Sequence, residues 1–241
     1  AYFAVLMKAR QYNRRILDGE TDCHVYAIQE SNGINRNHLK YLGAGMSDLE
    51  CHNAQNQMNG LLDTFIDAKE YGSILNVEPC SWDLLRRFAA QSSEEGQQSL
   101  DSMGLETTKV QILQLISIGQ AMAQKYNVVV TNPPYLGSSR FSPKLDAYVK
   151  KYYTDEKSDL SMAMFKHAMQ NFSCTDGFIA FITTSSWMSL SSFEKMRNSM
   201  YQSLTLDSLV DFGSELFDEK VGHNLIVAWV NRNSRVNGYR M

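Results

Sequence analysis

The stretch NVVVTNPPY at residues 127–135 holds the residue types of this chain that are best suited to chemistry. Each proline fixes its own φ and lacks an N–H donor, and the residue before a proline is held extended. Asn132 and Pro133 are therefore both extended, so the Asn132 side-chain oxygen and the Pro133 carbonyl are presented as acceptors. Pro134 and Tyr135 complete the segment, and the tyrosine adds a flat ring beside those acceptors.

Two fixed acceptors suit a planar NH2 group on a base or an amide. Such a nitrogen is a poor nucleophile, because its lone pair is delocalised. Acceptors that hold both hydrogens favour a pyramidal nitrogen, and they bind more strongly as positive charge develops during attack. Tyr135 can stack on the ring that bears the amine, which is worth roughly 1–3 kcal/mol. The alternative is that the segment only makes a rigid turn after a strand.

The residues around this stretch predict alternating helices and strands. Residues 109–126 place apolar side chains on one helical stripe, and NVVVTN (127–132) is a continuous apolar run, typical of a strand buried on both faces of a parallel sheet. Further elements are expected downstream: a helix over 159–172 capped by Ser158, a turn at 175–177, a strand over 178–184, a helix over 192–203, and strands over 204–212 and 224–231.

The residues before 109 are less regular. We expect an N-terminal helix over 1–17 with Phe3, Leu6, Met7 and Ala9 toward a core, a strand over 23–31, helices with one candidate strand at 73–77 within residues 34–90, and a polar surface loop over 91–108.

Alternating strands and helices predict an α/β fold with a mostly parallel sheet. In such sheets, the active site lies at the carboxyl ends of the strands. The residues 132–135 follow one of these ends directly, so the fold would place the acceptors and the tyrosine at the expected position of an active site.

Composition limits the alternatives. The chain has 241 residues, 44% hydrophobic and 20% charged, which is typical of a soluble globular protein. The net charge of −3 provides no general attraction for nucleic acid. No apolar run is long enough to cross a membrane, so no membrane partner is expected. The four cysteines and five histidines lack ligand spacing, which predicts free thiols in the cytoplasm and no metal site.

At this point the sequence resembles the class I adenine-specific DNA methyltransferases. More closely, it resembles the PglX family of BREX phage-defence methyltransferases and the type IIG restriction-modification methyltransferases. The stretches that carry the resemblance are YNVVVTNPPYLGSSRF, KSDLSMAMFKHAM, GFIAFITTSSWM, FEKMRNSM and VDFGSELFDEKVGHNLIV, in the order of the family.

The resemblance implies transfer of a methyl group from S-adenosyl-L-methionine to N6 of an adenine flipped out of double-stranded DNA. Asn132, Pro133, Pro134 and Tyr135 match the catalytic motif, with Tyr135 stacked on the adenine. Phe217 matches an aromatic residue that closes on the base, although a core phenylalanine would look the same. Arg140 would contact the DNA.

The resemblance also implies a set of cofactor contacts. Asn132, Asp159 and Glu30 match positions near the cofactor, although an aspartate in the first turn of a helix is also explained by the helix dipole. Glu30 matches the position that reads the adenine of the cofactor.

The family's glycine-rich cofactor loop and its DNA-recognition region have no counterpart here. The resemblance therefore implies an internal fragment with a partial Rossmann-like methyltransferase fold, which lacks the first two sheet strands. We expect residues 1–241 to form a single partial catalytic domain, with residues 34–108 as an insertion-like segment. The fragment alone is expected to be unstable and inactive.

Other functions share the NPPY motif. Enzymes that methylate a glutamine amide in release factors, or N2 of guanine in RNA, also act on planar amino groups. A non-catalytic remnant that binds DNA or partner proteins is a third alternative. Four basic residues after the tyrosine are candidates for phosphate contacts: Arg140, Lys144, Lys150 and Lys151. Other proteins of a phage-defence system are candidate partners.

Overall fold

The computed structural model describes residues 2–18, 23–92, 103–213 and 226–234. The α-helices of this part of the chain are α1 (Tyr2–Arg10), α2 (Asp48–Thr64), α3 (Ala68–Tyr71), α4 (Trp82–Ala90), α5 (Leu105–Ala123), α6 (Pro143–Tyr152), α7 (Leu160–His167), α8 (Ser186–Ser189) and α9 (Glu194–Ser203). The short helical turns are η1 (Arg36–Tyr41), η2 (Gly72–Ile74), η5 (Ser138–Arg140), η6 (Ala168–Phe172) and η7 (Ser191–Phe193). The strands are β1 (Tyr126–Thr131), β2 (Ser173–Thr184), β3 (Thr205–Gly213) and β4 (Ile226–Arg232).

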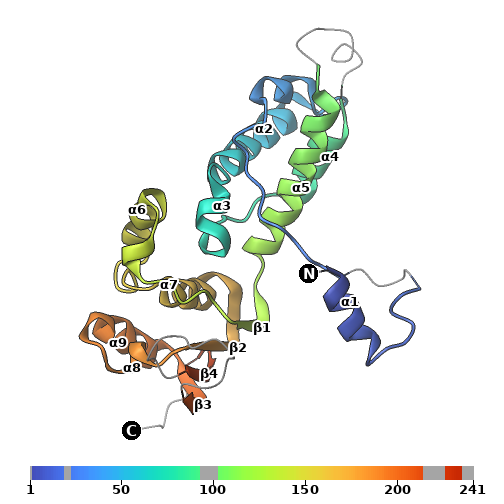
Figure 1. Ribbon diagram of the computed structural model, residues 1–241. Helices are drawn as coiled ribbons and strands as arrows, with labels where there is room; N and C mark the ends of the chain where they lie inside the picture. The colour runs from blue at the N-terminus through green and yellow to red at the C-terminus, as the bar shows by residue number, and fades with distance from the viewer. Residues whose placement is uncertain (1, 19–22, 93–102, 214–225, 235–241) are drawn as a thin grey trace.

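Residues 34–92 and 103–123, from η1 to α5, form a helical region that stands beyond the β1 edge of the sheet (Figure 1). α2 begins with a capping box, in which Ser47 and Glu50 each bond the backbone N–H of the other. The helices enclose one apolar core that includes Met58, Leu62 and Ile116. The expected helices are present, but the candidate strand at 73–77 is wrong, because η2 occupies its first half and no strand partner adjoins the rest.

The first thirty residues differ from expectation in two ways. α1 ends at Arg10 and buries none of its side chains, and Phe3 is 74% exposed, so the predicted packing of this helix is wrong. The strand expected at 23–31 does not form either. Those residues run extended without a strand partner until Ser31, whose N–H and hydroxyl bond the carbonyls of Phe65 and Leu62.

The four described strands form one sheet in the order β1-β2-β4-β3. β1 and β2 are parallel, whereas β4 runs antiparallel to both of its neighbours. The α/β class is therefore confirmed, but the sheet is mixed rather than mostly parallel. Helix α5 leads into β1 through only two residues, which places the start of β1 directly downstream of the helical region.

A bulge adjusts the pairing of β1 with β2. Tyr126 pairs with Ser173, but Val128 already pairs with Phe178, so residues 174–177 of β2 lie opposite the single residue Asn127 and β2 has three extra residues. The turn predicted at 175–177 lies here, inside the strand, and Asp176 takes a φ of +62°. A side chain on Gly177 would come within 3.0 Å of the Asn127 carbonyl oxygen, so the bulge packs closely against β1.

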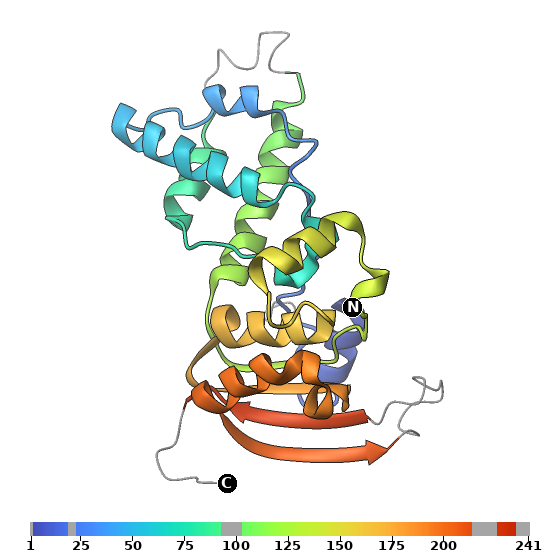
Figure 2. The same cartoon turned by 90° about the vertical axis from the view of Figure 1, so that its left-hand side faces the viewer.

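The two faces of the sheet are covered unequally. α7, α8 and α9 lie over one face, which is toward the viewer in Figure 2, and bury Phe165, Phe181 and Trp229 against it. On the other face, which we call the open face, Val128 is 58% exposed and Val130 is 72% exposed. The prediction that β1 is buried on both faces is therefore wrong.

Candidate functional site

The NPPY segment lies at the carboxyl end of β1, as predicted. Asn132 is exposed, Pro133 is buried and Tyr135 is half-buried. The Tyr135 hydroxyl donates a hydrogen bond to Oδ1 of Asn132 at 2.8 Å and lies 3.4 Å from the carbonyl oxygen of Ile182 on β2. The first and last residues of the motif therefore touch through their side chains.

The residues after Tyr135 are held by a second segment of the chain. The N–H of Ser138 bonds the carbonyl of Ser158 at 3.0 Å, and the N–H of Leu160 bonds the carbonyl of Leu136 at 2.9 Å. An antiparallel bridge between Gly137 and Asp159 lies between these two bonds. The backbone of Asp159 therefore runs alongside residues 136–138, which directly follow the NPPY segment.

Asp159, rather than the predicted Ser158, caps α7. Its Oδ1 accepts hydrogen bonds from the backbone N–H and the hydroxyl of Ser161, at 2.8 and 2.6 Å. Burial raises the pKa of the Asp159 carboxyl, and the two bonds from Ser161 oppose that shift. Ser161 was not among the predicted site residues, although a serine two positions after an N-cap aspartate is a readable signal.

Glu156 lies in the same segment and is 2% exposed. Burial raises the pKa of its carboxyl. Its Oε1 has no hydrogen-bond partner among the described residues. The segment beside the motif thus carries two acidic side chains whose charged forms are disfavoured by their surroundings.

Glu30, Arg140 and Phe217 are the remaining predicted site residues. Glu30 is 4.0 Å from Lys69 of α3, so it adjoins the helical region rather than the 132–140 segment. Arg140 is exposed at the end of η5, five residues after Tyr135. Phe217 lies outside the described residues, so its predicted contact with a base stays a prediction.

The lysines after the motif mostly have acidic partners. Lys144 pairs with Asp67 at 2.7 Å, and its hydrogen bond is the main cause of the lowered pKa of that aspartate. Lys150 pairs with Asp146 at 2.6 Å, one turn earlier on α6. Lys151 lies over the Tyr152 ring at 4.7 Å. Lys144 therefore fastens α6 to the helical region in this structure.

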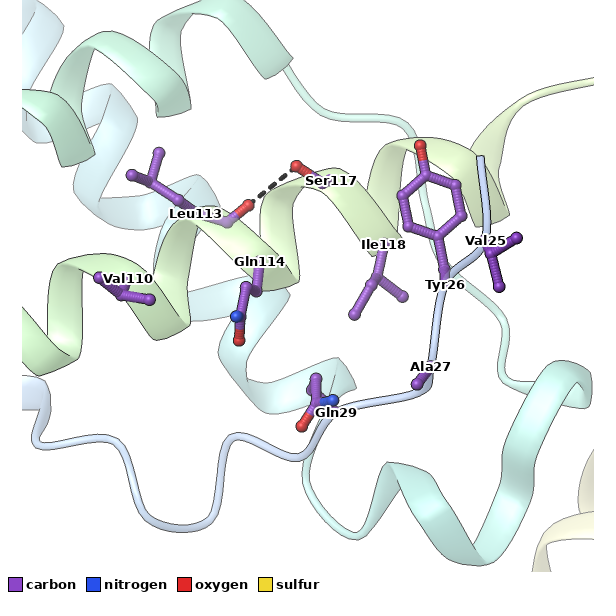
Figure 3. A pocket seen from close by; sticks show the side chains of 9 residues that line it. All are labelled: Val25, Tyr26, Ala27, Gln29, Val110, Leu113, Gln114, Ser117 and Ile118. Atoms are coloured by element: carbon purple, nitrogen blue, oxygen red, sulfur yellow. Dashed lines mark hydrogen bonds between the residues drawn. The ribbon is translucent and has the colours of Figure 1, made fainter. Parts of the chain in front are cut away.

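Figure 3 shows a pocket of about 500 Å³ between the extended residues 25–29 and helix α5. Its walls are largely apolar, with Leu113 and Ile118 on the helix side, and the Ser117 hydroxyl bonds the Leu113 carbonyl. Asn132 and Tyr135 do not line it. No Asp, Glu, His, Lys or Arg is among the residues that line the pocket.

Within the described ranges, no helix is long and apolar enough to cross a membrane. No group of three or more His, Cys, Asp or Glu side chains in the same ranges is arranged to hold a metal ion. The four cysteines are free thiols.

The geometry defines a class: an α/β protein with an NPPY segment at the end of a parallel-paired strand. Comparison with known families extends this result. The model of the Eco57I restriction-modification methylase family matches residues 28–217. The chain therefore belongs to that family, and its membership confirms the expected methyltransferase fold.

Two curated relatives match over 99% of this chain. The adenine-specific methyltransferase PglX of Lacticaseibacillus casei (strain Zhang) is 30% identical, and the adenine-specific methyltransferase BrxX of Escherichia coli O9:H4 (strain HS) is 27% identical. The chain spans 19% and 21% of their lengths.

The solved structures that are similar to this chain include the two that follow. One, from Listeria monocytogenes, is described as a class I S-adenosylmethionine-dependent methyltransferase, with 12% identity, a TM-score of 0.39, and coverage of 58% of this chain and 44% of that one. The other is the Type IIL restriction-modification enzyme MmeI in complex with DNA, with 16% identity, a TM-score of 0.38, and coverage of 85% and 36%.

Proposed function

We propose that the protein containing this chain transfers a methyl group to N6 of adenine in double-stranded DNA. The observation that carries the proposal is the contact between Asn132 and Tyr135 at the end of β1, in a chain of a restriction-modification methylase family. The two curated relatives are both named adenine-specific methyltransferases, which supports adenine as the target.

Each residue of the motif has a distinct task in this proposal. Asn132 Oδ1 and the Pro133 carbonyl accept the two N–H groups of the adenine. Both bind more strongly as the nitrogen gains a bond and becomes positive, and this difference lowers the barrier. The ring of Tyr135 stacks on the base, which must leave the duplex to reach this position. After transfer, the nitrogen would release one proton to water and become a neutral secondary amine, with S-adenosylhomocysteine as the second product.

S-adenosyl-L-methionine is the cofactor that this reaction needs, and it supplies an electrophilic methyl group. Some of the predicted cofactor-binding residues lie where they could contact this cofactor. Asp159 is half-buried and its backbone pairs with Gly137, two residues after the motif, so its carboxyl is a candidate contact for a cofactor that carries positive charge. Asn132 is exposed at the same place. Glu30 adjoins Lys69 instead, so we assign the cofactor contact to Asp159 and Asn132.

The DNA partner is proposed for the exposed surface around η5. Arg140 is exposed there and is available for a phosphate contact, whose contribution weakens as salt increases. Phe217 is proposed as the second aromatic contact with the base. Because bacterial DNA is its substrate, the protein would act in the cytoplasm, with other phage-defence proteins as candidate partners.

The test compares the full-length wild-type protein with its Asn132→Ala variant. Each is incubated with labelled S-adenosylmethionine and unmethylated DNA, with defence-system proteins added in parallel, and the digested DNA is analysed for N6-methyladenine. We expect the variant to lose about 100-fold or more in rate, because it lacks one of the two acceptors. Asn127→Ala is the matched control, since this exposed asparagine lies at the other end of β1.

The alternatives give different outcomes in the same assay. Label on a release factor or on RNA, with none on DNA, would move the function to those substrates. An Asn132→Ala variant as active as the wild type would contradict the role of the motif.

A further inference from the structure

The Tyr135 hydroxyl has one proton and two acceptors within reach. The distance to Asn132 Oδ1 is 2.8 Å, and the distance to the Ile182 carbonyl oxygen is 3.4 Å. The first distance is typical of an O–H···O hydrogen bond and the second is long. Burial raises the pKa of this hydroxyl, so it keeps its proton at neutral pH. The proton is therefore directed at Asn132.

This contact decides which way the Asn132 amide faces. An asparagine side chain carries an acceptor oxygen on one side and a donor NH2 group on the other, and half a turn exchanges them. A donated proton can be accepted only by the oxygen. Among the described residues, the Asn132 side chain makes no other hydrogen bond, so Tyr135 alone selects the orientation.

We propose that the Tyr135 hydroxyl is a positioning group that holds Oδ1 of Asn132 toward the edge of its own ring. This inference rests on the proposed function, because the amino group of an adenine stacked on that ring would come to the same edge. The amide oxygen has two lone pairs, so it can accept the hydroxyl and the amino group together. One tyrosine then sets both the plane of the base and the direction of the acceptor.

The Tyr135→Phe variant separates these two tasks, because it keeps the ring and removes the hydroxyl. Without the hydroxyl, the amide is free to present its NH2 group, which repels the adenine amine. We expect kcat to fall about three- to ten-fold, the size of one orienting hydrogen bond, with KM for DNA unchanged. Tyr135→Ala also removes the stacking surface and should raise KM.

A double-mutant cycle in the full-length protein identifies the partner of the hydroxyl. Single-turnover methylation of unmethylated DNA is measured for the wild type, Tyr135→Phe, Asn132→Ala and the double variant. In the Asn132→Ala background there is no oxygen to orient, so Tyr135→Phe should cost nothing more. Tyr126→Phe is the matched control, since its hydroxyl bonds the Ala121 carbonyl at the other end of β1.

Three results would overturn the inference: an unchanged kcat in Tyr135→Phe, an equal loss with and without Asn132, or faster methylation. Equal losses would assign the hydroxyl to the Ile182 carbonyl, and faster methylation would mean that it competes with the adenine. These results are distinct from failure of the proposed function, which would appear as a wild-type protein that makes no N6-methyladenine.

Discussion

The helical region and the sheet bury their apolar side chains in different ways. The helical region surrounds its core with helices from several directions, and Met58, Leu62 and Ile116 are fully buried there. The sheet has a core on one face only, while Val128, Val130 and Val210 share the open face. Apolar sequence is thus not enough to bury a strand, because burial depends on a second layer.

The largest expected effect is the difference in stability between a substitution on the covered face of the sheet and one on the open face. Phe165→Ala removes a ring that is 1% exposed and lies 4.3 Å from the Trp229 ring, so it should destabilise β2 by about 3–5 kcal/mol. Val130→Ala on the open face should change stability by less than about 0.5 kcal/mol. Hydrogen exchange of β2 peptides in the full-length protein measures both. A comparably large loss for Val130→Ala would show that the open face is covered there.

The second prediction concerns His167 of α7, whose partner Tyr153 also contacts the helical region. Its Nδ1 accepts from Asn171 at 2.9 Å, and the Tyr153 hydroxyl contacts both this nitrogen and the Ile74 carbonyl of the helical region. Burial, with a smaller contribution from Lys125, lowers the pKa of His167 from 6.5 to about 4. A proton on Nδ1 would also face the Asn171 amide donor.

The sign of the pH effect follows from that lowered pKa. As the pH falls, His167 of the unfolded chain binds a proton near pH 6.5, whereas His167 of the folded protein binds one only near pH 4. The stabilisation that neutral His167 provides is therefore complete above about pH 6.5 and is lost as the pH falls toward about 4. The loss should reach about 3 kcal/mol at most. Hydrogen exchange of α7 peptides between pH 7 and 4, corrected for intrinsic rates, measures it. His167→Gln should remove this dependence, and an unchanged slope in that variant would contradict the assignment.

The third and smallest prediction compares two glycines within the helical region. Gly43 and Gly45 have φ values of +76° and +79°, so alanine is strained at both. A side chain at Gly43 would also lie 2.8 Å from the Phe88 ring, whereas Gly45 has open space.

We expect Gly45→Ala to cost about 1 kcal/mol and Gly43→Ala about 2 to 3 kcal/mol. Thermal unfolding of the full-length variants, followed by calorimetry, checks the order. Equal costs would mean that Phe88 moves aside freely.

The sequence predicted the position of the NPPY segment after a strand better than it predicted the packing of the surrounding elements. Two prolines restrict the backbone wherever they occur, so the segment from Asn132 to Tyr135 could be interpreted from its own chemistry. The helix over 109–126 was also readable, although it begins earlier, at Leu105. In both cases the information is local.

The errors concern interactions between distant segments. Residues 23–31 have the composition of a strand but find no partner in the described structure, and β1 has an apolar run but only one covered face. The direction of β4 depends on its neighbours rather than on its own residues. The hydrogen bond between Tyr135 and Asn132 was likewise not predicted, because a sequence motif does not specify the rotamers of its side chains.

The bulge on β2 has a consequence for how the chain can change in length. From Val128 and Phe178 onward, the two strands pair without interruption to Thr131, so the motif is held in register with Ile182. An inserted residue beyond Phe178 would shift this register by about 3.3 Å and turn every later side chain to the opposite face. An insertion near Thr175, which is exposed in the bulge, would only enlarge a loop. Alignment gaps should therefore collect at 174–176 and be absent between 178 and 184.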